Sequence, residues 1–176
     1  MRTLLYAAVA IALLNFQATA QEPSSRVEPW TSYRFLLGEW VGEGEGQPGQ
    51  GKGQFSFAEE LQGKILVRKN RAEYAASAGR PAFTHEDLLI VYQEDGAKTQ
   101  KAIYFDSEGH VIHYTPSTSQ DGKALIFLSD ARPSAPRYRL TYVNQEAGKA
   151  TVKFEVAPPG KPEAFQTYLQ GRVRKK

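Results

Sequence analysis

Hydrophobic and polar residues alternate along most of this chain, a pattern typical of half-buried β-strands. The alternation is clearest in the run Leu36-Leu37-Gly38-Glu39-Trp40-Val41-Gly42-Glu43-Gly44-Glu45-Gly46. Its glycines share one parity with Trp40 and its glutamates take the other, and successive side chains of a strand point to opposite faces. We therefore expect a strand whose acids face water. Its glycine face would allow sharp bending and the close approach of other backbone or a ligand, as the first strand of a small barrel requires.

The rest of the chain reads as short strands divided by turns. Further strands are predicted over residues 53–60, 64–74, 84–93, 101–105, 110–115, 124–129, 137–143, 151–156 and 165–173. Turn signals separate them at residues 47–51, Asp95-Gly96, 106–109, Asp121-Gly122 and 158–160. No window keeps helical spacing, so helix is limited to a short turn near Tyr33 or Pro162.

About ten strands with frequent turns predict an all-β sandwich or barrel. Consecutive hairpins favour a single antiparallel up-and-down β-barrel, because sandwiches need longer crossover links and closure removes exposed strand edges. We place this barrel over residues 33–176. A barrel of this size has room for one small ligand.

The Gly38-Glu39-Trp40 triplet resembles the Gly-x-Trp signature of lipocalin-like (calycin) barrels. The longer run from Leu36 to Gly46 is similar to the opening of the nitrobindin-like haem-binding barrels and of a related family of uncharacterised secreted bacterial barrels. The resemblance implies that a basic side chain of the last strand, Arg172 or Arg174, covers Trp40 and helps to close the barrel.

The nitrobindin-like resemblance also implies haem b, held by a histidine near the C-terminal end, and activity on nitrogen oxides. Residues 165–176 contain no histidine. Haem binding here would need an axial ligand from another strand, His110 or His113. We therefore expect no cofactor and keep a haem protein as an alternative.

The first 20 residues have the pattern of a secretory signal peptide cleaved after Ala20. A basic start at Arg2 is followed by an apolar run over residues 4–16 and the small-x-small site Ala18-Thr19-Ala20. A membrane anchor would need about 18 apolar residues, which this run does not reach. We expect a periplasmic or secreted protein with no membrane span after cleavage, and a flexible leader over residues 21–32 until Trp30 and Tyr33 dock on the barrel.

Composition narrows the possible chemistry. The chain has no cysteine, which excludes disulfides, thiolate sites and a lipid-anchored lipoprotein. It has 22 basic and 19 acidic residues, and this net charge of +3 is too small to indicate nucleic-acid binding. The basic run over residues 172–176 is interpreted as a solvated tail.

Three histidines are candidates for a ligand site. His85 shares a strand face with Asp87, an arrangement suited to a metal or to a base with its orienting acid. His110 and His113 are three residues apart and so face opposite sides of a strand. No recognised metal-binding spacing occurs, and we predict no metal site.

A second group of candidates lies on the strand 64–74, where Leu66, Arg68, Asn70, Ala72 and Tyr74 share one parity. If this face turns inward, it places a cation, an amide and a phenol in an apolar barrel, which suits an anionic or carboxylate ligand. The alternative places Arg68 at the barrel mouth in a surface ion pair. Tyr104 and Tyr114 would add hydroxyls from later strands.

Catalytic templates such as Gly-x-Ser-x-Gly and a phosphate loop are missing from the sequence, and we expect no enzyme activity. The favoured function is the binding of a small, largely apolar or amphipathic molecule in the barrel. A structural or protein-interaction module with a filled core is the third possibility. The ligand candidates are Arg68, Asn70, Tyr74, His85, Tyr104, His110, His113 and Tyr114, and the core candidates are Phe55, Phe57, Phe105, Phe127 and Phe154. Ligand identity and oligomeric state stay open.

Overall fold

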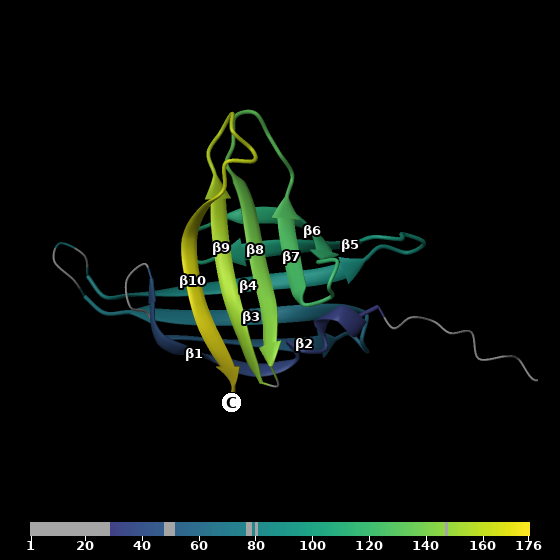
Figure 1. The fold of residues 1–176 in the computed structure, drawn as a ribbon, viewed down its shortest axis with the longest axis horizontal. Helices are drawn as coiled ribbons and strands as arrows, with labels where there is room; N and C mark the ends of the chain where they lie inside the picture. The colour runs from purple at the N-terminus through teal and green to yellow at the C-terminus, as the bar shows by residue number, and fades with distance from the viewer. Residues whose placement is uncertain (1–28, 48–51, 77–78, 80, 147) are drawn as a thin grey trace, which may run out of the picture.

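Ten antiparallel strands close into one barrel in a computed structural model, which describes residues 29–47, 52–76, 79, 81–146 and 148–176 (Figure 1). The strands are β1 (Gly38–Gln47), β2 (Lys52–Glu60), β3 (Ile65–Tyr74), β4 (Phe83–Gln93), β5 (Gln100–Asp106), β6 (Val111–Thr118), β7 (Ala124–Ser129), β8 (Arg137–Glu146), β9 (Lys149–Ala157) and β10 (Gln166–Lys175). Each strand pairs with its neighbours in sequence, and β1 pairs with β10. The predicted all-β, up-and-down barrel is confirmed.

The turns lie where their sequence signals predict them. Gly96, Gly109 and Gly122 have φ of +72°, +89° and +71°, in the left-handed region that glycine adopts without steric cost. The predicted short helix near Tyr33 is a 3-10 turn, η1 (Thr31–Tyr33). Most of the turn predicted over residues 47–51 lies outside the described residues, as do the predicted signal peptide and most of the leader.

One end of the barrel is closed by η1 and the residue before it. Trp30 and Tyr33 are both buried in the core. The Trp30 indole Nε1 donates to the carbonyl of Gly63 at 2.7 Å, and the Tyr33 hydroxyl donates to Gln100 Oε1 at 2.8 Å. These bonds tie η1 to the β2–β3 connection and to the first residue of β5, so the chain before β1 forms the floor of the barrel.

Trp40 joins the first strand to the core and to the last strand. Its ring is stacked on that of Phe55 with centroids 5.8 Å apart, and its Nε1 donates to the carbonyl of Leu36 at 2.7 Å. The Nζ atom of Lys175 lies 5.5 Å from the centroid of the Trp40 ring, at a distance where a cation attracts an aromatic face.

The basic side chain over Trp40 is therefore that of Lys175 and not that of Arg172 or Arg174, which is a correction to the predicted pairing. Trp40 pairs directly with Lys175 across the β1–β10 ladder, whereas Arg174 pairs with Val41. Arg172 and Arg174 are exposed on the outer face. The register of β1 against β10 decides which basic residue turns inward, and a single sequence does not show that register.

Aromatic side chains fill the middle of the barrel. Tyr142 contacts the rings of Phe55, Phe57 and Phe127 with centroid separations between 5.6 and 6.2 Å. Of the predicted core phenylalanines, these three are buried. Phe105 instead lies on the outer face with 40% of its surface exposed, because β5 turns its even-numbered residues inward.

The connections β3–β4, β5–β6, β7–β8 and β9–β10 lie at the end opposite η1, which we call the open end. Inward-facing side chains keep partial exposure there, among them His85, Tyr104, Tyr138 and Phe154. In Figure 1, η1 lies at the right beside the β4–β5 connection, and β3 and β4 extend past β10 at the left. Solvent therefore reaches some inward-facing side chains at the open end.

We predict that Trp40→Ala lowers the free energy of unfolding by about 3–5 kcal/mol, because it leaves a cavity between Phe55 and the first strand. Urea denaturation measures the change. The control is Lys175→Gln, which removes only the cation over the ring and should cost about 1 kcal/mol or less. An unchanged denaturation midpoint for Trp40→Ala would refute the role given to this residue.

Candidate functional site

The inward faces of β3 and β4 meet in a polar patch. On β3 the even-numbered residues turn inward, with Leu66, Arg68 and Ala72 buried, and on β4 the odd-numbered residues do so. The β3–β4 ladder places Asn70 opposite Asp87 and Ala72 opposite His85. The even face of the strand 64–74 is thus the inward one, and charged groups lie inside an otherwise apolar barrel.

Arg68 and Asp87 form a buried ion pair at the centre of this patch. The Arg68 Nη1 atom donates to Asp87 Oδ1, and only 8% and 4% of the two side chains are exposed. Asn70 Nδ2 donates to the other oxygen, Asp87 Oδ2, at 2.8 Å. Burial is the largest single effect and disfavours the charged guanidinium, but Asp87 together with the nearby phenols of Tyr142, Tyr104 and Tyr114 outweighs it, and the pKa of Arg68 is raised above its ordinary value.

His85 extends the ion pair toward the open end. Its Nε2 lies 3.2 Å from Asp87 Oδ2, and its Nδ1 lies 2.8 Å from Glu108 Oε2 in the β5–β6 connection. The hydrogen bond to Asp87 raises the pKa of His85, and the charges of Asp87 and Glu108 raise it further against the opposing effect of burial. We call Arg68, Asn70, His85, Asp87 and Glu108 the buried charge cluster, of which Glu108, with 41% of its side chain exposed, is the member at the rim.

Three tyrosines surround the buried charge cluster. The Tyr104 hydroxyl lies 3.3 Å from His85 Nε2. Burial raises the pKa of Tyr104, Tyr114 and Tyr142 above the ordinary value, so these phenols stay protonated at neutral pH. Among the described residues, two buried polar atoms have no hydrogen-bond partner, Arg68 Nε and the Tyr142 hydroxyl oxygen.

The opposite side of the open end is aromatic. Tyr138 of β8 and Phe154 of β9 stack with centroids 6.0 Å apart, and Tyr168 of β10 meets Phe154 edge-on at the same separation. In the strand order of the barrel, β9 lies five places from β4 in either direction. The aromatic wall of β8–β10 therefore faces the polar wall of β3–β5 across the barrel.

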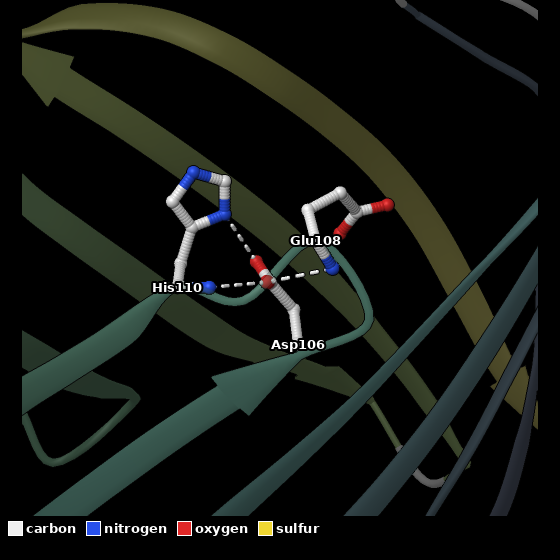
Figure 2. A group of neighbouring side chains, drawn as sticks. All are labelled: Asp106, Glu108 and His110. Atoms are coloured by element: carbon white, nitrogen blue, oxygen red, sulfur yellow. Dashed lines mark hydrogen bonds and ion pairs between the residues drawn. The ribbon is translucent and has the colours of Figure 1, made fainter.

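Asp106, Glu108 and His110 meet at the rim (Figure 2). Asp106 Oδ1 accepts from the backbone nitrogens of Glu108 and His110 at 3.1 and 2.8 Å, and Asp106 Oδ2 lies 2.8 Å from His110 Nδ1. These hydrogen bonds outweigh desolvation and lower the pKa of Asp106. The three side chains are of types that bind divalent cations, but the contacts of Asp106 are those of a side chain that closes the β5–β6 turn.

The structure brings together Arg68, Asn70, His85, Tyr104 and Tyr114 of the predicted ligand candidates. Tyr74 lies further out, stacked on Phe83 with centroids 4.5 Å apart. His110 is at the rim, and His113 is exposed on the outer face of β6. The surface ion pair considered for Arg68 is wrong, because its partner is buried inside the barrel.

Five further residues complete this region and were not among the predicted ligand candidates, although Asp87 was named as the partner of His85 and Phe154 as a core residue; they are Asp87, Glu108, Tyr138, Tyr142 and Phe154. The spacing of His85 and Asp87 was a usable signal for Asp87. Glu108 belongs to a turn, and only the fold brings it to His85. The tyrosines resemble ordinary strand residues in sequence.

None of the three histidines is placed to serve as the axial ligand of a haem iron. Both ring nitrogens of His85 lie within hydrogen-bonding distance of carboxylates, so neither is free for iron in this arrangement. His110 is 62% exposed at the rim and bonded to Asp106, and His113 points away from the interior. A haem group inside the barrel would therefore lack a suitable histidine to hold its iron.

Two surface hollows lie apart from the buried charge cluster. One of about 230 Å³ lies beside η1 and includes Tyr33 and Gln100, and one of about 420 Å³ lies against the β3–β4 connection and includes Tyr74 and Phe83. Neither is lined by Arg68 or His85. Charge and hydrogen bonding, rather than surface shape, distinguish the candidate site.

Comparison with known proteins finds no family model that matches this chain and no curated protein similar to it. In the part of the chain that the structure describes, none of the helical segments has the length and apolar character needed to cross a membrane.

We predict that Asp87→Ala lowers the free energy of unfolding by about 3–5 kcal/mol, because it leaves the Arg68 guanidinium buried without its carboxylate. The matched control replaces both charges by apolar side chains, Arg68→Met with Asp87→Leu, and should be close to neutral in stability. Urea denaturation of the two variants compares them. A single variant as stable as the double variant would contradict the burial of the pair.

The raised pKa of His85 predicts that the stability of the protein depends on pH. Its pKa in the folded protein is raised, so its stabilising contribution is complete below the unfolded value of about 6.5 and is lost as pH rises through the folded value. We expect the melting temperature to differ more between wild type and His85→Gln at about pH 6 than at about pH 9. The control is His113→Gln on the outer face. A difference that grows with pH would contradict the ion pairs of His85.

Proposed function

We propose that this protein is a secreted or periplasmic, lipocalin-like binding protein that holds one small amphipathic molecule at the open end of its barrel. The observation that carries this proposal is the pair of unlike walls at that end. Hydrogen-bonding groups of Asn70, His85 and Tyr104 line one side, and the rings of Tyr138 and Phe154 line the other. A ligand with one apolar and one polar part matches both walls.

The side chains of these walls are inward-facing and partly exposed, so they are accessible from solvent. His85 keeps 24% of its side-chain surface exposed although it is bonded to two carboxylates. Partly exposed aromatic side chains offer a ligand large contact areas at low entropic cost. The aromatic packing of Tyr142 with Phe55, Phe57 and Phe127 sets the depth that a ligand can reach from the open end, which favours a small molecule.

The buried charge cluster changes the ligand chemistry expected from the sequence. Arg68 alone would favour an anion, but Asp87 neutralises it and Glu108 balances a protonated His85. An anionic ligand would therefore bring an uncompensated charge to a buried site. We propose an amphipathic, uncharged ligand in place of a carboxylate.

The relation to lipocalin-like barrels is part of this proposal. Its supports are the closed antiparallel barrel, the buried tryptophan of the Gly38-Glu39-Trp40 triplet and the basic side chain of Lys175 over that ring. The nitrobindin-like alternative has weaker support, because His85, His110 and His113 are placed unfavourably for haem.

The proposal predicts saturable binding of N-phenyl-1-naphthylamine, an apolar fluorescent probe, with one site per chain and a blue-shifted emission. Phe154→Ala should weaken binding by about tenfold, because it removes the ring that stacks on Tyr138. Phe105→Ala is the matched control, since Phe105 is exposed on the outer face. Fluorescence titration measures both dissociation constants.

Absence of saturable binding would support a structural or interaction module instead. An equal loss in the Phe154 and Phe105 variants would place the probe outside the barrel. In the same preparation, a Soret shift on addition of haem that disappears in His110→Ala or His113→Ala would identify a haem protein.

A further inference from the structure

Among the described residues, two buried side-chain polar atoms in the barrel interior have no hydrogen-bond partner. They are Arg68 Nε and the Tyr142 hydroxyl oxygen, in residues that are 7% and 0% exposed. Buried polar atoms are nearly always hydrogen-bonded, and leaving one unpaired costs stability. A protein retains such atoms most readily where a bound molecule supplies their missing hydrogen-bond partner.

The side chains that carry these two atoms both contact Phe55. The Arg68 guanidinium carbon lies 5.3 Å from the centroid of the Phe55 ring, and the Tyr142 ring lies 5.8 Å from the same ring. Each group also affects the ionisation of the other, as expected of neighbours in a medium of low polarity. Arg68 and Tyr142 thus approach one region from opposite walls, β3 and β8.

This region is rich in donors. Arg68 Nε carries a hydrogen and accepts nothing, and a protonated phenol such as Tyr142 also donates. We infer that Arg68 Nε and the Tyr142 hydroxyl together bind the carbonyl oxygen of an uncharged ligand, such as a ketone, an aldehyde or an amide. The inference rests on the proposed function and specifies the polar part of its ligand.

Charge balance selects a neutral acceptor over a carboxylate. The Arg68 guanidinium is already paired with Asp87 through Nη1, so its charge is compensated before a ligand binds. His85 lies between Asp87 and Glu108, which balances its own charge when protonated. A carbonyl oxygen accepts both hydrogen bonds without bringing a net charge into the barrel.

Arg68 lies deep enough below the open end to bind the polar end of a ligand that enters there. On β3, Arg68 lies two residues, about 7 Å, further from the open end than the partly exposed Asn70. If the carbonyl of a ligand binds Arg68 and Tyr142, the apolar part of that ligand would extend toward the rings of Tyr138 and Phe154.

The test uses three naphthalenes of similar size, 2-acetylnaphthalene, 2-ethylnaphthalene and 2-naphthoate, which compete with N-phenyl-1-naphthylamine. We expect 2-acetylnaphthalene to bind wild-type protein at least tenfold more tightly than the other two. Tyr142→Phe should reduce this preference to about twofold or less, because it removes one donor and keeps the ring. Tyr92→Phe, on the outer parity of β4, should keep the preference.

A thermal melt without ligand provides a second readout. Because the Tyr142 hydroxyl has no partner, Tyr142→Phe should leave the melting temperature unchanged or raise it. A clear fall would show that the hydroxyl is hydrogen-bonded in the ligand-free protein and would overturn the inference. Probe binding by wild type without preference for the ketone, or with preference for the carboxylate, would overturn the inference alone, whereas absence of probe binding would overturn the proposed function.

Discussion

Closure of the sheet between β1 and β10 is the constraint on which the other features depend. Once the first and last strands pair, every strand has one inward and one outward face, and each side chain is assigned to one of them. The contact of Trp40 with Phe55 and Lys175 lies at this seam. Closure also determines that Arg68 and Asp87 lie in a region of low polarity, where an ion pair is strong but an unpaired charge is costly.

The buried charge cluster is a region where stability and function make different demands. An apolar barrel interior would be simpler to stabilise than one containing Arg68, Asp87 and His85. The unpaired Tyr142 hydroxyl adds a further cost that packing alone does not explain. The structure compensates each charge with an opposite one, and leaves donors rather than charges for a ligand. Electrostatic balance, more than the presence of an arginine, therefore determines the ligand class that we propose.

Much of the fold could be predicted from sequence because strand periodicity and turn chemistry are local. Asp95-Gly96 and Asp121-Gly122 lie in turns whose glycines have positive φ. The candidate site could be predicted from sequence less completely than the fold. Arg68 and Asn70 were selected from their shared parity, but parity does not show which face is inside. Glu108 and Tyr142 contact the site across large sequence separations, and Lys175 replaces the expected arginines because register is set by pairing between distant strands.

By itself, the sequence determined that this protein is built of antiparallel strands joined by tight turns, since alternation and glycine turn signals act over a few residues. Only the tertiary structure decided that the face of Arg68 points inward and that Asp87 neutralises it. It also decided that β4 and β9 place a polar and an aromatic wall opposite each other. The physical reason is that these relations depend on closure and register, which join residues far apart in the chain and are set by the packing of the whole barrel.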